Sequence, residues 1–113
     1  MKRLALVLIV AALGGGVLAP ADARAADPEV ALIIDDNRFI PEEIKVKAGT
    51  PFVLVITNRD ATAEEFESKE LRIEKIVPAG KTVKVRIRAL SPGTYPFFGE
   101  YHEKTAKGRI VAE

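Results

Sequence analysis

Apolar and charged side chains alternate strictly over residues 83–88, and this stretch limits the fold of the chain more than any other. Val83, Val85 and Ile87 are interleaved with basic residues. Successive side chains of a β-strand point to opposite faces of a sheet. The pattern therefore predicts a strand with one buried face and one solvated face.

Further short runs rich in β-branched and aromatic residues occur along the chain, each ending at turn-forming residues. Pro41 cannot donate a ladder hydrogen bond, so the chain is expected to cross a sheet edge or corner there. Residues 52–56 are almost wholly apolar, which predicts a central strand covered on both faces. About seven short strands separated by turns predict an all-β sandwich. The expected strands are residues 30–34, 44–48, 52–56, 71–74, 83–88, 94–98 and 109–111.

Residues 59–70 lie between two of these strands and are mostly polar or small. We expect a loop over residues 59–63, and Ala and Glu would also allow one or two helical turns over residues 61–70. Phe66 is the one large apolar residue of the stretch. It is expected to anchor the loop to the core.

The N-terminal residues have the pattern of a secretory signal peptide. Lys2 and Arg3 precede an apolar run over residues 4–18, and Ala23 and Ala25 supply the small residues that signal peptidase recognises. The run is shorter than a membrane-spanning helix requires, so an uncleaved anchor is the weaker alternative. We expect a signal peptide over residues 1–25, one domain over residues 26–113, and export to the periplasm.

Composition narrows the function of that domain. The whole chain has 17 basic and 16 acidic residues, a balance that does not favour a nucleic-acid partner. It contains no cysteine, so the core has to be stable without disulfides. The single histidine, His102, has no evident Ser or Cys partner for nucleophilic catalysis, and no nucleotide-binding glycine loop is present.

An ordered set of phrases resembles the cupredoxins over nearly all of residues 26–113. The resemblance implies a Greek-key β-sandwich of about seven or eight strands. The phrases comprise the spaced residues Phe39, Pro41, Ile44, Val46, Ala48 and Gly49, then Asn58, then Val77-Pro78-Ala79-Gly80, then Pro92, Gly93, Tyr95 and Phe97, and finally His102.

The chain departs from the electron-carrying cupredoxins at their copper ligands. Those proteins have a Cys three residues before the loop His, where this chain has Gly99. Their Met position falls near Ala106 or Lys107, and their first His lies within residues 63–67; of the ligands, His102 alone is retained. Without a thiolate, a blue type 1 copper centre is not expected.

Acidic residues stand at the position of the first His and beside that of the lost Cys. Glu65-Phe66-Glu67 resembles the Cys-less cupredoxin components of bacterial Efe/Ftr-type ferrous-iron uptake systems. The resemblance implies a periplasmic protein that binds iron or copper(II), assists ferrous-iron oxidation or uptake, and works with a membrane iron permease and other periplasmic components. A ferroxidase-like activity is left open. The implied metal ligands are Glu64, Glu65, Glu67, Glu100 and His102.

Several alternatives remain at this point. Glu64 shares side-chain parity with the inward-facing Phe66, so either Glu64 or Glu65 could be the ligand at the old His position. A run of acids is more often a solvated surface than a site, and a lone His is more often a surface residue than a ligand. The other functions considered are a cupredoxin-fold interaction module without a metal and a periplasmic copper-binding protein. We expect a monomer or a weak dimer.

Overall fold

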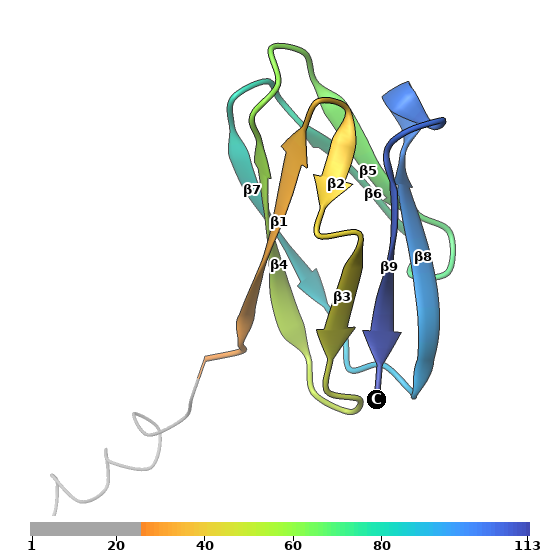
Figure 1. Cartoon of the computed structure of the whole chain (residues 1–113). Coiled ribbons are helices and arrows are strands. Elements are labelled where there is room, and N and C mark those ends of the chain that lie inside the picture. Colours follow the sequence, from red (N-terminus) through yellow and green to blue (C-terminus); the bar gives the residue numbers. More distant parts are fainter. Residues whose placement is uncertain (1–25) are drawn as a thin grey trace, which may run out of the picture.

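The computed structural model describes residues 26–113, which form an all-β sandwich (Figure 1). The predicted signal peptide over residues 1–25 lies outside the described residues. Within residues 26–113, no helix has the length and hydrophobicity needed to cross a membrane. The elements are β1 (Glu29–Asp35), β2 (Arg38–Ile40), β3 (Glu43–Val46), β4 (Phe52–Asn58), β5 (Glu64–Ser68), β6 (Ile73–Val77), β7 (Thr82–Ile87), β8 (Gly93–Gly99), the 3₁₀-helix η2 (Glu100–His102) and β9 (Lys107–Ala112).

The strands form two sheets, with orders β2-β1-β4-β7 and β3-β9-β8-β5-β6. The chain changes sheets at Pro41, between β2 of the first sheet and β3 of the second, as the missing N–H predicts. The Ile40–Pro41 peptide bond is cis. The all-β sandwich expected from the sequence is thus confirmed, with short β2 and β5 added to the expected strands.

The core lies between the two sheets and is built from alternate residues of each strand. Phe39, Phe66 and Phe97 are each at most 1% exposed and pack with ring centroids 5.0–6.0 Å apart. β4 is central in its sheet, as predicted, but Val53 and Val55 are only half-buried. The expectation that β4 is covered on both faces is therefore wrong, because only its inner face packs against the second sheet.

Residues 59–63 form the expected loop, but residues 64–68 form β5, so the helical turns allowed over residues 61–70 are wrong. β5 pairs with β6 on one side and β8 on the other. Its alternation was hard to recognise because two of its three inward side chains, Glu64 and Ser68, are polar. Phe66, the third, lies in the core as expected.

Candidate metal centre

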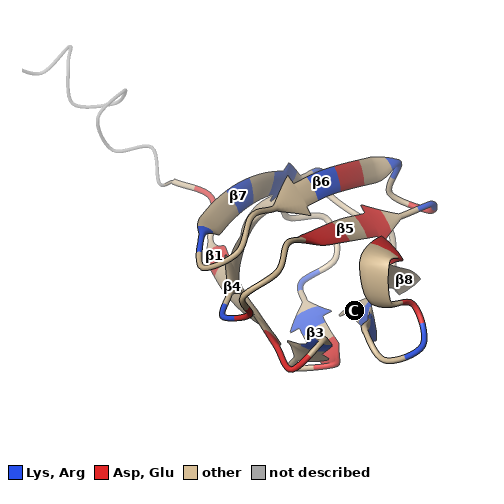
Figure 2. Cartoon of the chain, turned by 90° about the horizontal axis from the view of Figure 1, so that it is seen from above, with Lys and Arg blue, Asp and Glu red and all other residues tan. Residues whose placement is uncertain are grey.

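β5 carries three glutamates whose side chains divide between the two faces of its sheet. Glu64 faces the interior and is 1% exposed, whereas Glu65 and Glu67 face outward and are half-buried. Figure 2 shows acidic residues along β5, and this strand contacts η2. The predicted ligands on this strand therefore cannot all point toward one ion.

On the inner face, Glu64 pairs with His102, and we call these two residues the inner pair. Nδ1 of His102 lies 2.6 Å from Oε2 of Glu64. Oε1 of Glu64 accepts hydrogen bonds from the main-chain N–H groups of Glu65 and Tyr101, each at 2.9 Å. A fully buried carboxylate is costly unless it is hydrogen-bonded. These contacts meet that requirement with groups of the chain itself.

Gly99 provides the space that the inner pair needs. A Cβ atom built on Gly99 would lie 2.5 Å from Cδ of Glu64 and 2.8 Å from Cβ of Ala106, closer than non-bonded atoms allow. Gly99 is the position at which the electron-carrying cupredoxins have their Cys, so the Glu64 carboxylate lies where that side chain would begin. The residues present therefore do not fit a thiolate–copper centre.

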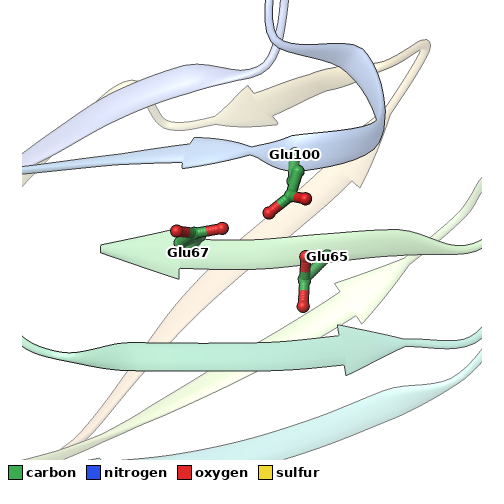
Figure 3. Close-up of side chains that lie close together, drawn as sticks. All are labelled: Glu65, Glu67 and Glu100. Carbon is green, nitrogen blue, oxygen red and sulfur yellow. The ribbon is translucent and has the colours of Figure 1, made fainter. Parts of the chain in front are cut away.

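On the outer face, Glu65, Glu67 and Glu100 form what we call the outer acidic cluster (Figure 3). One carboxylate oxygen from each residue lies within 4.8 Å of the others. Glu100 is the first residue of η2, and it follows directly on Gly99, the Cα partner of Phe66 in the β5–β8 ladder. Strand pairing thus brings together two segments that are far apart in the sequence.

The crowding of the outer acidic cluster shifts its proton equilibria. Hydrogen bonding to Glu100, partial burial and neighbouring negative charges raise the pKa of Glu67 to about 7. Partial burial and the same Glu100 carboxylate raise the pKa of Glu65. Hydrogen bonding with the Glu67 and Glu65 carboxyl groups lowers the pKa of Glu100. Glu65 and Glu67 therefore hold a proton more readily than ordinary glutamates do, at a place where a cation could replace it.

One oxygen of this cluster lacks a partner. Oε1 of Glu67 is buried and has no hydrogen-bond partner among the described residues. Buried polar atoms are usually satisfied, and a bound cation would satisfy this oxygen. Carboxylate oxygens suit iron, manganese, zinc or cupric ion and suit cuprous ion poorly. The outer acidic cluster can accordingly hold a hard or borderline cation.

The structure arranges the five predicted ligands in two groups rather than one. It brings Glu65, Glu67 and Glu100 together and places Glu64 with His102 on the other face of β5. This geometry assigns Glu65 to the acidic cluster and Glu64 to the histidine. That any of these residues binds a metal stays a prediction.

Sequence reasoning did not single out Glu74. This residue is the Cα partner of Glu67 across β5 and β6, and its charge contributes to the raised pKa values of Glu65 and Glu67. Directly opposite like charges on neighbouring strands destabilise a sheet. The register of β5 against β6 would have revealed Glu74, but that required recognising β5 as a strand.

Comparison with known proteins agrees with this architecture. A family model described as a cupredoxin-like domain matches residues 5–112. The uncharacterized protein RP394 of Rickettsia prowazekii (strain Madrid E) is 41% identical over 83 residues, which cover 74% of this chain and 66% of that protein. The chain thus spans about two thirds of the length of that relative.

Solved structures show the same fold at low sequence identity. Auracyanin A, a "blue" copper protein from Chloroflexus aurantiacus, has a TM-score of 0.68 at 15% identity, covering 78% of this chain and 100% of that one. A purple cupredoxin from Nitrosopumilus maritimus has a TM-score of 0.56 at 15% identity, covering 74% and 99%. From the family match, supported by the sandwich topology, we conclude that the chain belongs to the cupredoxin-like domain family.

Proposed function

We propose that this protein binds a divalent or trivalent cation, iron or cupric ion, through the outer acidic cluster. The observation that carries the proposal is the convergence of three carboxylates from β5 and η2 within 4.8 Å. The buried, unpaired Oε1 of Glu67 supports it, because a cation would supply the partner that this atom lacks. Binding would also relieve the repulsion among the three acids.

Iron is the cation that we favour. Oxygen donors bind hard and borderline ions, and the cluster offers no thiolate or thioether for cuprous ion. Carboxylates also stabilise ferric more than ferrous ion, so the site would favour oxidation of bound ferrous ion. Each ferrous ion would give up one electron, which dioxygen can accept.

The cellular role that follows is assistance in ferrous-iron uptake. In this proposal the protein is exported to the periplasm, loads iron at the outer acidic cluster and passes it to a membrane permease. The sequence resemblance to Cys-less cupredoxin components of such uptake systems supports this role. The position of the cluster on an outer sheet face, where a permease or another periplasmic component could reach it, is compatible with transfer.

A second candidate is an interaction module without a metal. Ile76 and Tyr101 are 52% and 50% exposed. Ile76 is the cross-strand partner of Glu65, and Tyr101 follows Glu100 in the chain. Exposed apolar side chains beside charged ones are a feature of protein interfaces. In this alternative, the acids would instead meet basic side chains of a partner.

Calorimetric titration of a charge-neutral variant distinguishes the two. The variant replaces Glu65, Glu67 and Glu100 by Gln, and it is titrated with cupric ion and, without oxygen, with ferrous ion. We expect affinity to fall by roughly two orders of magnitude or more, since the ligand charge is lost. A control variant of equal net charge replaces the exposed acids Glu42, Glu70 and Glu113 by Gln.

The control variant should bind both ions as the wild-type protein does. If both variants bind like the wild type, the outer acidic cluster is not the metal site; if the wild type binds neither ion, the interaction module is favoured. Readmitting air to the ferrous complex then tests oxidation. Faster appearance of ferric ion with wild-type protein than with the Gln variant would support the iron-uptake role over simple copper binding.

A further inference from the structure

The position of Glu100 in the outer acidic cluster depends on the direction in which η2 leaves β8. The β5–β8 ladder ends at the pair formed by Phe66 and Gly99, and Glu100 is the next residue. Glu100 therefore lies beyond the last ladder pair. Something else has to fix η2 against β5 if Glu100 is to stay beside Glu65 and Glu67.

Glu64 supplies that connection from the opposite face of β5. Its Oε1 accepts from the N–H of Tyr101 and its Oε2 contacts Nδ1 of His102, so two of the three residues of η2 are bound to one carboxylate. The same Oε1 accepts from the N–H of Glu65, which ties the carboxylate to its own strand. Hydrogen bonds to a charged acceptor are stronger than neutral ones.

Outside the outer acidic cluster, the other hydrogen bonds found for this loop among residues 26–113 do not reach β5. The N–H of Ala106 donates to the carbonyl of His102, and the N–H of Gly99 donates to the carbonyl of Ala106, which closes the loop on itself. The hydroxyl of Thr105 donates to the carbonyl of Asn37 and anchors the far end. These contacts shape the loop, whereas the contacts of Glu64 set its placement over β5.

We propose that Glu64 is a positioning residue: its buried carboxylate holds η2 against β5 and thereby keeps Glu100 beside Glu65 and Glu67. The expected effect of Glu64 on metal binding rests on the proposed function, whereas its effect on the placement of η2 does not. Glu64 faces away from the outer acidic cluster, so it acts on that cluster through η2 rather than as a ligand. Although η2 follows a glycine, Gly99, the side chain of Glu100 is thereby held in one position.

The metal-free protein provides the first test, by hydrogen exchange at the amide of Tyr101. Glu64→Ala removes the acceptor of that amide, and we expect its exchange to become roughly tenfold to a hundredfold faster, as for loss of one hydrogen bond to a charged group. Glu64→Gln keeps an acceptor oxygen and should restore most of the protection. If the Ala variant folds poorly, the Gln variant still reports on the hydrogen bond to Tyr101.

Ser68→Ala is the matched control. Ser68 is the other buried polar residue of β5, and its hydroxyl bonds to Pro96 and Leu71 rather than to η2. This variant should leave Tyr101 exchange unchanged even if overall stability falls. Equal acceleration in Ser68→Ala and Glu64→Ala would show a general loss of stability and overturn the positioning role.

The second test is a double-mutant cycle on cupric-ion affinity. Glu100→Gln should weaken binding by roughly tenfold in the wild-type background and by much less in Glu64→Ala, where Glu100 is no longer held in place. Equal losses in the two backgrounds would contradict the proposal. If the wild-type protein binds no ion, the proposed function fails by itself, and the exchange experiment still decides whether Glu64 positions η2.

Discussion

Both faces of β5 carry glutamate side chains, but the surroundings of these carboxylates differ between the two faces. On the inner face, the carboxylate of Glu64 is fully buried and each of its oxygens has a partner. On the outer face, Glu65 and Glu67 crowd against Glu100, and one buried oxygen of Glu67 is unpaired. The inner carboxylate is satisfied by the chain, whereas the outer carboxylates repel one another and leave one buried oxygen without a partner among the described residues.

This contrast shows why a list of ligand-type residues does not by itself define a site. Glu64 has the most buried carboxylate of β5, yet its contacts make it a structural residue. A bound cation would stabilise a carboxylate that is already hydrogen-bonded only slightly. It would stabilise carboxylates that repel one another much more. Substitutions on the two faces should therefore change stability in opposite directions.

The largest effect is expected from Glu64→Ala on the inner face. This change leaves the Tyr101 N–H without its acceptor and removes the partner of His102. We expect a loss of about 2–3 kcal/mol in the free energy of unfolding, as for buried groups left unsatisfied. Urea denaturation without metal measures it, and a change close to zero would show that the inner pair does not stabilise the fold.

Gly99→Ala should be the next most damaging substitution. The added Cβ would meet the carboxylate of Glu64 and the side chain of Ala106 at distances below 3.0 Å. We expect a cost of about 1–2 kcal/mol, because the surrounding core has to shift. The cost should be smaller in a Glu64→Ala background, where one of the two obstacles is gone. Equal costs in both backgrounds would contradict the close packing of Gly99 against Glu64.

On the outer face, Glu67→Gln should leave metal-free stability unchanged or raise it. The raised pKa of Glu67, about 7 against an ordinary 4.5, means that the folded protein binds a proton more tightly than the unfolded chain does. Stability from this group is therefore greatest below pH 4.5 and falls as the pH rises toward 7. The lowered pKa of Glu100 acts below 4.5, outside this interval.

Urea denaturation at pH 5 and pH 8 tests this dependence. Relative to Glu67→Gln, the wild-type protein should lose stability between the two pH values. The matched comparison is Glu70→Gln, at an exposed acid outside the cluster, which should keep the wild-type dependence. If Glu67→Gln also keeps it, the crowding of the outer acidic cluster does not control the proton on Glu67.

The smallest signal is expected from the visible spectrum of the cupric form. The chain has no cysteine, so the intense thiolate-to-copper charge-transfer band cannot form. Carboxylate ligation should give only weak ligand-field absorption, and Glu65→Gln should alter it while Ser68→Ala should not. An intense band in pure protein would be incompatible with the ligands assigned here.

The sequence predicted those strands in which apolar residues that face the core alternate with polar residues that face solvent. β7 is the clearest case, since Val83, Val85 and Ile87 alternate with basic residues. β5 was missed because its inward positions are Glu64, Phe66 and Ser68, and a polar residue faces the core only when tertiary contacts satisfy it. Those contacts come from β8 and η2, which lie some thirty residues away.

The same limit explains what could be predicted of the candidate site. The sequence identified the acids and His102, and the parity of Glu64 with Phe66 was visible. Their separation into an inner pair and an outer acidic cluster follows only once residues 64–68 form a strand. Glu74 was missed for the same reason, because its position opposite Glu67 depends on the β5–β6 register.

Anomalous X-ray diffraction from crystals of the iron-loaded or manganese-loaded protein tests the central claim most directly. The account predicts a peak among Glu65, Glu67 and Glu100, at a coordination distance of roughly 2.0–2.4 Å from carboxylate oxygens that include Oε1 of Glu67. The hydrogen bonds between Glu64 and η2 should be intact in the same crystals. A peak between Glu64 and His102, with none at the outer acidic cluster, would contradict the account.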